Sequence, residues 1–297
     1  MSLLFSHEIK AAVGKELSTA KKSIQIISAY CKLNALKQLH NQISKDIESK
    51  KLMLRFRMDD ILKHSTDFEI LDFCNHNGWE VYLRFDLHAK TYIVDNKRGI
   101  VGSANLTSKG LGFTKAANLE MGSLLEIEPQ DITKIDKMYK DAIKVDKELY
   151  KNLKQQIENY KKSGSEKIPH WSNEITDLFH PQVDILFSYE FPESKEVSAN
   201  TEFFLDISLD ADREQLKEAF QWCNAYLWLV RTLRDNQGCL YFGALSEKLH
   251  NTLVSDPRPY RKEVKELLAN LLAWVEELGM EEIVIDRPRH SQRIRLL

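Results

Sequence analysis

Two pairs of polar residues have the types and the spacing needed to bind and attack a phosphate group. His88 and Lys90 stand two residues apart, and so do Ser103 and Asn105. Residues two apart on a strand project to the same face. Lysine supplies positive charge, while the hydroxyl and the amide supply neutral donors for the non-bridging oxygens of a phosphodiester. Histidine adds a nucleophile for the phosphorus atom.

A β-hairpin is the element expected to bring these two pairs together. Apolar residues follow Lys90 and precede Gly102, which indicates two buried strands, and residues 95–99 between them have turn chemistry. Asp95 opens this turn, so we interpret it as a structural residue rather than a proton carrier. Gly102 is expected to let the backbone approach the phosphate closely.

The complete pattern is H-x-K-x4-D-x6-G-S-x-N, and it resembles the signature of the phospholipase D superfamily. The resemblance implies an α/β/α sandwich, a covalent phosphohistidine formed by His88, and chemistry that requires no metal or other cofactor. Asn118-Leu119-Glu120 resembles the N-x-E segment that follows the motif in many relatives, where the glutamate fixes the histidine tautomer. The candidate catalytic residues are His88, Lys90, Asp95, Ser103, Asn105 and Glu120.

The motif occurs once, because none of the other eight histidines is followed by lysine two places on. In the family, a second histidine protonates the leaving group, and it comes from a second motif or from a second subunit. The resemblance therefore implies a homodimer, with the active site across the two-fold axis.

Composition narrows the class of protein. The chain has 297 residues, 43% of them hydrophobic, and a net charge of −2. We find no signal peptide and no stretch long enough to cross a bilayer, so we expect a cytoplasmic protein without a membrane partner. The four cysteines lack C-x2-C spacing, which favours reduced core residues over a zinc site.

The chain before about residue 165 alternates between helical and strand patterns. Helices are expected over 6–21, 33–49 and 66–76, strands over 23–30, 51–57, 79–85 and 118–127, and a long helical stretch over 129–162. This order predicts an α/β sandwich with a mixed sheet. A Ser-Gly-Ser break in a charged run near 163–165 predicts the boundary between a catalytic domain, 1–165, and a C-terminal domain, 166–297.

The second domain is expected to be a smaller α+β unit. Strands are expected over 183–190 and 201–209, a helix capped by Asp212 runs to residue 234, and helices over 244–253 and 260–278 precede strands over 282–286 and 292–296. Helix, turn, helix and hairpin is the order of a winged helix. The residues expected to contact nucleic acid are Arg258, Arg261, Lys262, Lys265, Arg287, Arg289 and Arg293. Alternatively, these charged side chains only keep the outer face of the domain in contact with solvent, or the domain binds protein.

Three classes of function remain open. The first is a metal-independent DNA endonuclease, because the motif region looks most like the restriction- and helicase-associated branch, whose members often serve in restriction or anti-phage defence. The second is a lipid phosphodiesterase or transphosphatidylase. The third is a non-catalytic nucleic-acid-binding subunit, with a helicase or an ATPase as its partner.

Overall fold

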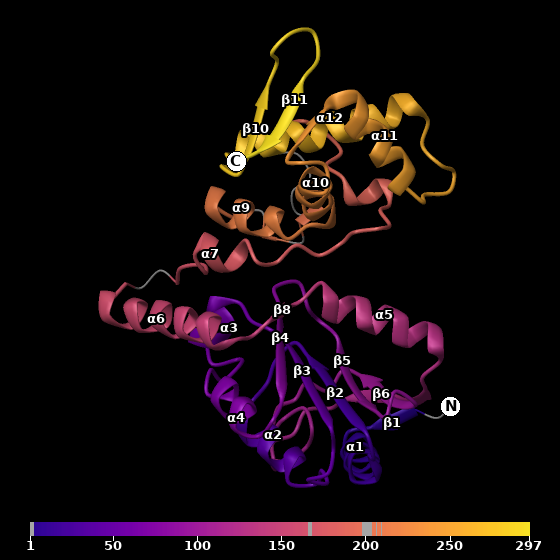
Figure 1. Cartoon of the computed structure of the whole chain (residues 1–297), viewed down its shortest axis with the longest axis vertical. Coiled ribbons are helices and arrows are strands. Elements are labelled where there is room, and N and C mark those ends of the chain that lie inside the picture. Colours follow the sequence, from indigo (N-terminus) through magenta and orange to yellow (C-terminus); the bar gives the residue numbers. More distant parts are fainter. Residues whose placement is uncertain (1–2, 166–167, 198–203, 206, 209) are drawn as a thin grey trace. The chain divides into compact units, whose positions relative to one another are not determined.

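The structure is a computed structural model that describes residues 3–165, 168–197, 204–205, 207–208 and 210–297. The chain divides into two compact units, residues 1–179 and 180–297 (Figure 1). The division falls after the sequence-based boundary at 165 because residues beyond it pack on the first unit. The Trp171 indole Nε1 donates a hydrogen bond to the Phe56 carbonyl at 2.6 Å, and the Phe179 ring packs edge-on against Phe85.

An eight-stranded mixed sheet forms the centre of the first unit, in the order β1-β7-β6-β5-β2-β3-β4-β8. The strands β2, β3 and β4 are parallel, and the other pairings are antiparallel. Their bounds are β1 Leu3–Phe5, β2 Ser23–Ser28, β3 Ser49–Arg55, β4 Glu80–Arg84, β5 Lys90–Val94, β6 Arg98–Gly102, β7 Met121–Glu126 and β8 Ile143–Lys144. This confirms the mixed sheet.

Helices cover both faces of this sheet. Tyr139 of α5 packs with Ile27 and Met53 on one face, while Ile9 of α1 lies against Gly122 on the other. The helices are α1 His7–Thr19, α2 Leu33–His40, α3 Met58–Leu62, α4 Ile70–His76, α5 Pro129–Lys140, α6 Lys147–Ser163 and α7 Asn173–Thr176 (Figure 1). The α/β/α sandwich is confirmed.

Helices α2 and α4 are shorter than the sequence pattern predicts, and the long helical stretch is divided. The helix expected over 66–76 begins at Ile70. The helix expected over 33–49 ends at His40, although Ile43 and Ile47 beyond it are buried and continue the apolar spacing. The stretch 129–162 contains two helices, because Ile143–Lys144 pairs with β4 as a short edge strand. Asp146 then starts α6 by accepting a hydrogen bond from the Leu149 N–H at 2.8 Å.

The second unit is a smaller α+β structure, as expected. Its elements are α9 Arg213–Gln221, α10 Asn224–Arg234, β9 Cys239–Tyr241, α11 Phe242–Thr252, α12 Arg261–Leu278, β10 Ile283–Asp286 and β11 Arg293–Leu296. The three strands form one antiparallel sheet in the order β10-β11-β9. None of the described helices in either unit is long and apolar enough to span a membrane.

The first part of this unit differs from the prediction. The strand expected over 183–190 is wrong: Leu186 makes only an isolated bridge with Leu253, and residues 188–190 form a short 3-10 helix. The strand expected over 201–209 lies largely outside the described residues. The predicted helix from 212 to 234 is broken into α9 and α10 at residues 222–223.

Candidate active site

Five of the six candidate catalytic residues meet at one edge of the large sheet. Lys90 opens β5 with His88 two residues before it, Ser103 and Asn105 follow the end of β6, and Glu120 precedes β7. These ends coincide because β6 is antiparallel to both β5 and β7. Ser103 and Asn105 lie in a loop rather than on the predicted strand. The edge is also where β2 and β3 end.

His88 has the properties of a nucleophile. Its side chain is exposed, and neither ring nitrogen has a hydrogen-bond partner among the residues that the structure describes. Partial loss of hydration lowers the pKa of His88 below its ordinary value of 6.5, and the charges of Lys90 and Arg55 lower it further. The imidazole is therefore neutral near pH 7, which is the form that can attack phosphorus.

Lys90 supplies a cation beside His88. Its Nζ donates a hydrogen bond of 2.6 Å to the backbone carbonyl of His88. Partial burial lowers the pKa of Lys90, as does the charge of Arg55, while Glu120 opposes this shift. Two of the three ammonium protons stay available for phosphate oxygens.

Asn105 is oriented as a donor. Its Oδ1 accepts a hydrogen bond from the Tyr30 N–H at 3.0 Å, so its Nδ2 points away from that contact. This Nδ2 has no partner within the described part of the chain. The predicted role as a neutral donor therefore has suitable geometry.

Ser103 and Glu120 form a hydrogen-bonded pair. The Ser103 Oγ donates to the Glu120 carboxylate and accepts from the Met121 N–H at 3.1 Å. Asn118 donates to the same carboxylate at 3.0 Å. The only Ser103 proton is thus engaged, which differs from the predicted contact to phosphate. The His88 ring has no hydrogen bond to Glu120 in the described residues, and the tautomer role of Glu120 stays a prediction.

Asp95 lies at the other end of β5, away from the five residues above. Its carboxylate accepts hydrogen bonds from the N–H groups of Lys21, Lys22 and Ser23 at 2.7–3.2 Å. Burial alone would raise the pKa of Asp95, but these hydrogen bonds outweigh it and lower the pKa. Asp95 therefore ties the hairpin to the start of β2, which agrees with its interpretation as a structural residue and not with a place among the catalytic groups.

A glycine is needed at position 102 for packing of the sheet, and not for the predicted approach of the backbone to a phosphate. A Cβ at this position would lie 2.5 Å from the Met121 carbonyl oxygen and 2.7 Å from the Gly122 Cα. The glycine therefore permits the close approach of β6 and β7. This approach sets Ser103 beside Glu120.

The sequence analysis did not single out Tyr30 and Arg55, which lie at the same edge. Tyr30 follows β2, and Arg55 is the last residue of β3. The sequence carried a signal for both residues, since each is a polar residue at or just after the end of a buried apolar run. The carboxyl ends of adjacent parallel strands are common ligand sites.

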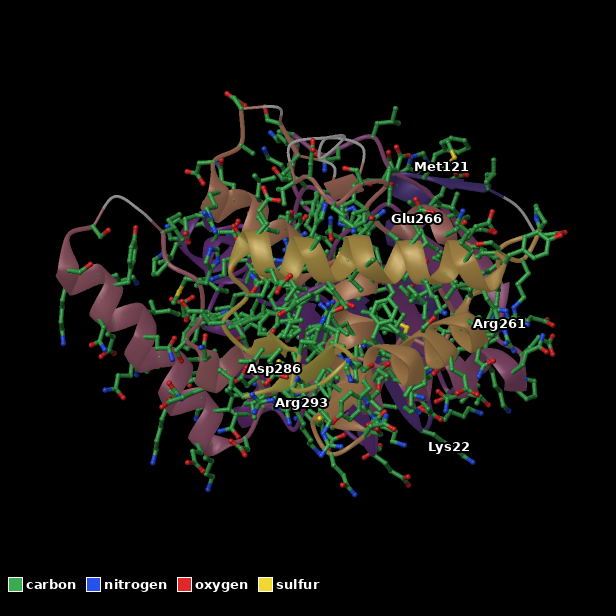
Figure 2. All side chains as sticks on the ribbon, turned by 90° about the horizontal axis from the view of Figure 1, so that it is seen from above. Lys22, Met121, Arg261, Glu266, Asp286 and Arg293 are labelled. Carbon is green, nitrogen blue, oxygen red and sulfur yellow. The ribbon has the colours of Figure 1, made fainter. Side chains whose placement is uncertain are left out.

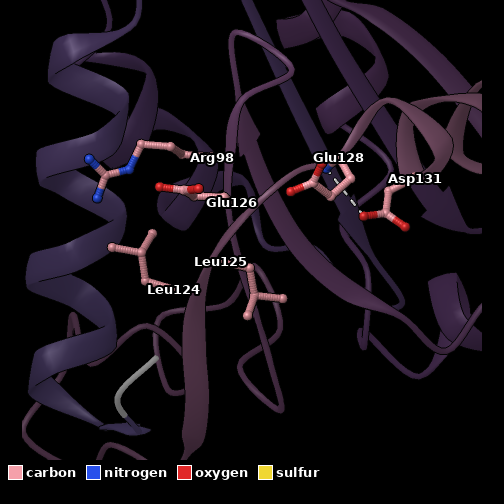
Figure 3. A pocket seen from close by; sticks show the side chains of 6 residues that line it. All are labelled: Arg98, Leu124, Leu125, Glu126, Glu128 and Asp131. Atoms are coloured by element: carbon pink, nitrogen blue, oxygen red, sulfur yellow. Dashed lines mark hydrogen bonds between the residues drawn. The ribbon is translucent and has the colours of Figure 1, made fainter.

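A hollow at the opposite edge does not suit a phosphate. Figure 3 shows its lining, which includes Arg98, Glu126, Glu128 and Asp131. Three of these residues are acidic, and Arg98 is paired with Glu16 at 3.0 Å. The edge that holds His88 and Lys90 has the positive charge that a phosphate requires.

In the second unit, the predicted basic residues differ in their surroundings. Arg258, Arg261, Lys262 and Lys265 are exposed before and within the first turns of α12, and Arg287 and Arg289 are exposed at the hairpin tip. Arg293 is instead paired through Nε and Nη2 with Asp286 at 2.9 and 2.7 Å (Figure 2). This pairing differs from the prediction, in which the Arg293 side chain contacts a phosphate of the nucleic acid.

The middle of α12 is covered by the chain's own residues. The Asn270 Nδ2 donates to the Pro192 carbonyl at 2.9 Å, and the Trp274 Nε1 donates to the Ser194 carbonyl at 3.0 Å. The start of α12, around Arg261 in Figure 2, presents the exposed basic side chains Arg261, Lys262 and Lys265.

Comparison with known proteins agrees with the geometry of the first unit. A family model described as "Cardiolipin synthase, PLD-like domain" matches residues 13–143, which include all six candidate catalytic residues. Residues 13–143 therefore form a domain of the phospholipase D superfamily. The chain is accordingly a phosphodiesterase of this family. No curated protein matches the chain.

Solved structures of three members of this superfamily are similar to part of the chain. Nuc from Salmonella typhimurium is 17% identical, with 48% of this chain and 96% of that chain covered and a TM-score of 0.40. NucT from Helicobacter pylori is 16% identical, with 48% and 98% covered and a TM-score of 0.38. Phosphatidylserine synthase from Haemophilus influenzae Rd KW20 is 13% identical, with 57% and 44% covered and a TM-score of 0.40.

Proposed function

We propose that this phosphodiesterase is a metal-independent nuclease that cuts DNA, in a restriction or phage-defence role. The observation that carries the proposal is the meeting of the exposed His88 imidazole, the Lys90 ammonium and the Asn105 amide, whose Nδ2 has no partner among the described residues, at one sheet edge. Such a site suits an anionic diester, because a cation and a neutral donor stabilise the charge that develops in the transition state.

The reaction proceeds in two steps. An unprotonated ring nitrogen of His88 attacks phosphorus; the P–N bond forms, and the bond from phosphorus to the leaving oxygen breaks as that oxygen receives a proton from an acid. In the second step, the same group takes a proton from water. The resulting oxygen attacks phosphorus, the P–N bond breaks, and His88 is released.

We propose that the acid is His88 of a second copy of the chain, which carries the proton of the reacting pair while the attacking His88 is neutral. An exposed apolar surface next to the site supports this: Leu3, Phe5, Val101, Leu119 and Met121 are 40–88% exposed. Strand pairing places Leu3, Phe5, Val101 and Met121 on one face of β1, β7 and β6, and Met121 is hydrogen-bonded to Ser103. Apolar patches of this kind mark association surfaces.

Sedimentation of charge variants tests this surface. We expect Met121→Asp to shift a dimer to monomers, because it would bury an unpaired charge in the contact. Leu178→Asp is the matched control, since Leu178 is 52% exposed against 49% for Met121 and is distant in sequence from the patch. A monomeric wild-type protein that is fully active would contradict the shared site.

The second unit favours nucleic acid over lipid as the substrate. The helix, strand, helix, helix and hairpin from α10 to β11 follow the order of a winged helix, and exposed Arg261 and Lys262 lie at the start of α12. Arg258 lies before this helix and donates a hydrogen bond to the His250 carbonyl. Basic residues at a helix start fit contacts to phosphates of a nucleic-acid backbone.

Substrate assays in EDTA separate the classes of function. Purified protein and His88→Ala are incubated with plasmid, single-stranded DNA, RNA and phosphatidylcholine vesicles. We expect cleavage of DNA that the His88→Ala variant loses. Release of choline without DNA cleavage would favour a lipid phosphodiesterase. Binding of DNA without cleavage of any substrate would favour a non-catalytic subunit of a helicase or ATPase complex.

A further inference from the structure

Arg55 lies outside the sequence motif but at the same edge of the sheet as His88 and Lys90. Ser28 pairs with Leu54 on one side and with Lys90 on the other, so the end of β3 is level with the start of β5. The side chain of Arg55 is only 16% exposed. A guanidinium group buried to this degree needs partners that compensate for its lost hydration.

Two residues fix the orientation of this guanidinium. Asp60, itself buried, accepts hydrogen bonds from Nε at 2.8 Å and from Nη2 at 2.7 Å. The Tyr30 hydroxyl accepts a second bond from Nη2 at 2.6 Å, and the guanidinium carbon lies 4.7 Å from the centre of the Tyr30 ring. A bidentate ion pair with an aromatic contact leaves the planar group little freedom to move.

The same contacts leave one end of the guanidinium open. Nη1 carries two N–H donors and has no hydrogen-bond partner among the described residues. Tyr30 also connects Arg55 to the motif, because its backbone N–H holds the Asn105 Oδ1 at 3.0 Å. One residue therefore orients two groups that each keep donors for a ligand.

We propose that Arg55 is a substrate-binding residue of this site, whose Nη1 holds a non-bridging oxygen of the scissile phosphate, with Asp60 and Tyr30 as positioning residues. The inference rests on the proposed function and adds a second cation to it. With Lys90 and Asn105, Arg55 surrounds a phosphoryl group that gains negative charge as His88 attacks.

The charge of Arg55 has an effect on its neighbours that can be measured. Partial burial of His88 is the largest cause of its lowered pKa, and the charges of Lys90 and Arg55 lower this pKa further. The charge of Arg55 also lowers the pKa of Lys90, after the effect of partial burial. Removal of the guanidinium should therefore raise the pKa of His88 toward its ordinary value of 6.5. The pKa of His88 therefore reports whether the charge of Arg55 lies beside the site.

The neighbouring strand provides a matched control. Arg84 stands opposite Arg55 in the register of β3 and β4, and it forms an equivalent bidentate pair with Asp86 at 2.8 Å. It is not among the charges that shift the pKa of His88. Arg84→Gln therefore reproduces the loss of a buried ion pair without the proposed loss of a substrate contact.

The test compares Arg55→Gln, Arg55→Lys and Arg84→Gln with the wild type. Hydrolysis of bis(p-nitrophenyl) phosphate gives kcat/KM, and an NMR titration of the His88 ring gives its pKa. We expect Arg55→Gln to lower kcat/KM by about 10²–10³-fold and to raise the pKa of His88. Arg55→Lys should keep the low pKa but lower kcat/KM at least about tenfold, because lysine has no fork to be oriented.

Arg84→Gln should leave the pKa of His88 unchanged and kcat/KM of the folded protein within about twofold. If Arg55→Gln does not fold, Tyr30→Phe removes only the hydroxyl acceptor and should lower kcat/KM by about tenfold. Wild-type kcat/KM in Arg55→Gln would overturn the inference. So would a loss equal to that in Arg84→Gln with an unchanged His88 pKa, and so would an unimpaired Tyr30→Phe where Arg55→Gln does not fold.

A wild-type protein that hydrolyses no diester would contradict the proposed function but not decide the role of Arg55. Inorganic phosphate then serves as the probe. We expect it to shift the His88 resonance in the wild type at a concentration at least about tenfold lower than in Arg55→Gln. Equal affinity in both proteins would overturn the inference about Arg55.

Discussion

At the scale of single residues, the surroundings of His88 keep its imidazole uncharged. Partial burial lowers the pKa of His88 below 6.5, and the charges of Lys90 and Arg55 lower it further. The unprotonated nucleophile is therefore present above this lowered pKa and is lost as the pH falls through it. We expect the acidic limb of the profile of kcat/KM against pH to lie below pH 6.5. An acidic limb above pH 7 would contradict this account of the site.

Ser103 and Asn105 should differ in their contribution to catalysis. The Asn105 Nδ2 is free for phosphate, whereas the Ser103 proton is engaged by Glu120. We expect Asn105→Ala to lower kcat by about 10²–10³-fold and Ser103→Ala by about tenfold or less. Steady-state kinetics measures both, and an equal loss would show that Ser103 also binds the phosphate.

The motif predicted the residues of the site better than their individual roles. Sequence spacing identified His88, Lys90 and Asn105, which the fold brings together. It could not show that Ser103 donates to Glu120 or that Arg55 lies beside His88, because both contacts join segments distant in sequence. Those contacts depend on the order of strands in the sheet, which periodicity alone does not specify.

At the scale of elements, Asp95 attaches the β5–β6 hairpin to the start of β2. Its carboxylate accepts three backbone N–H groups, so Asp95→Ala leaves these donors without their partner. We expect a loss of about 1–3 kcal/mol in the free energy of unfolding, with kcat of the folded protein little changed. Urea denaturation measures the loss.

The pH dependence of this stabilisation has a definite sign. The pKa of Asp95 is lowered in the folded protein, so its contribution is complete above the ordinary value near 3.8 and is lost as the pH falls through the lowered pKa. The difference in stability between wild type and Asp95→Ala should therefore shrink below about pH 4. A difference that grows with acidification would contradict the hydrogen-bonding role.

Most strands could be predicted from apolar runs, but some boundaries could not. Ile43 and Ile47 are buried in the loop after α2 and continue its apolar spacing, so the pattern alone cannot show that the helix ends at His40. Likewise, Ile143–Lys144 becomes a strand only because the edge of β4 is available to pair with it.

At the scale of the whole molecule, we expect nucleic acid to contact the start of α12 rather than its covered middle. Arg261→Glu combined with Lys262→Glu should weaken DNA binding and reduce the slope of log affinity against log salt by about 2. The control is Lys161→Glu with Lys162→Glu, an adjacent pair on α6 that should leave the slope near the wild-type value. An unchanged slope in the α12 variant would favour a protein-binding role for this unit.

Sharing of the site between two chains predicts a dominant effect of an inactive partner. If each site needs two His88 side chains, wild-type chains coassembled with equal amounts of His88→Ala should retain about one quarter of the activity of an equal total amount of wild-type protein. Independent sites would retain about one half. The mixture also distinguishes the acid of the second copy from an acid within the same chain.

Trapping of the covalent intermediate tests the central claim most directly. The protein is mixed with excess DNA in EDTA, quenched under denaturing alkaline conditions, digested and analysed by mass spectrometry. We predict an acid-labile phosphoryl–nucleotide adduct on His88 that is missing from the His88→Ala variant. DNA cleavage that requires a divalent metal ion and leaves no adduct on His88 would contradict the account.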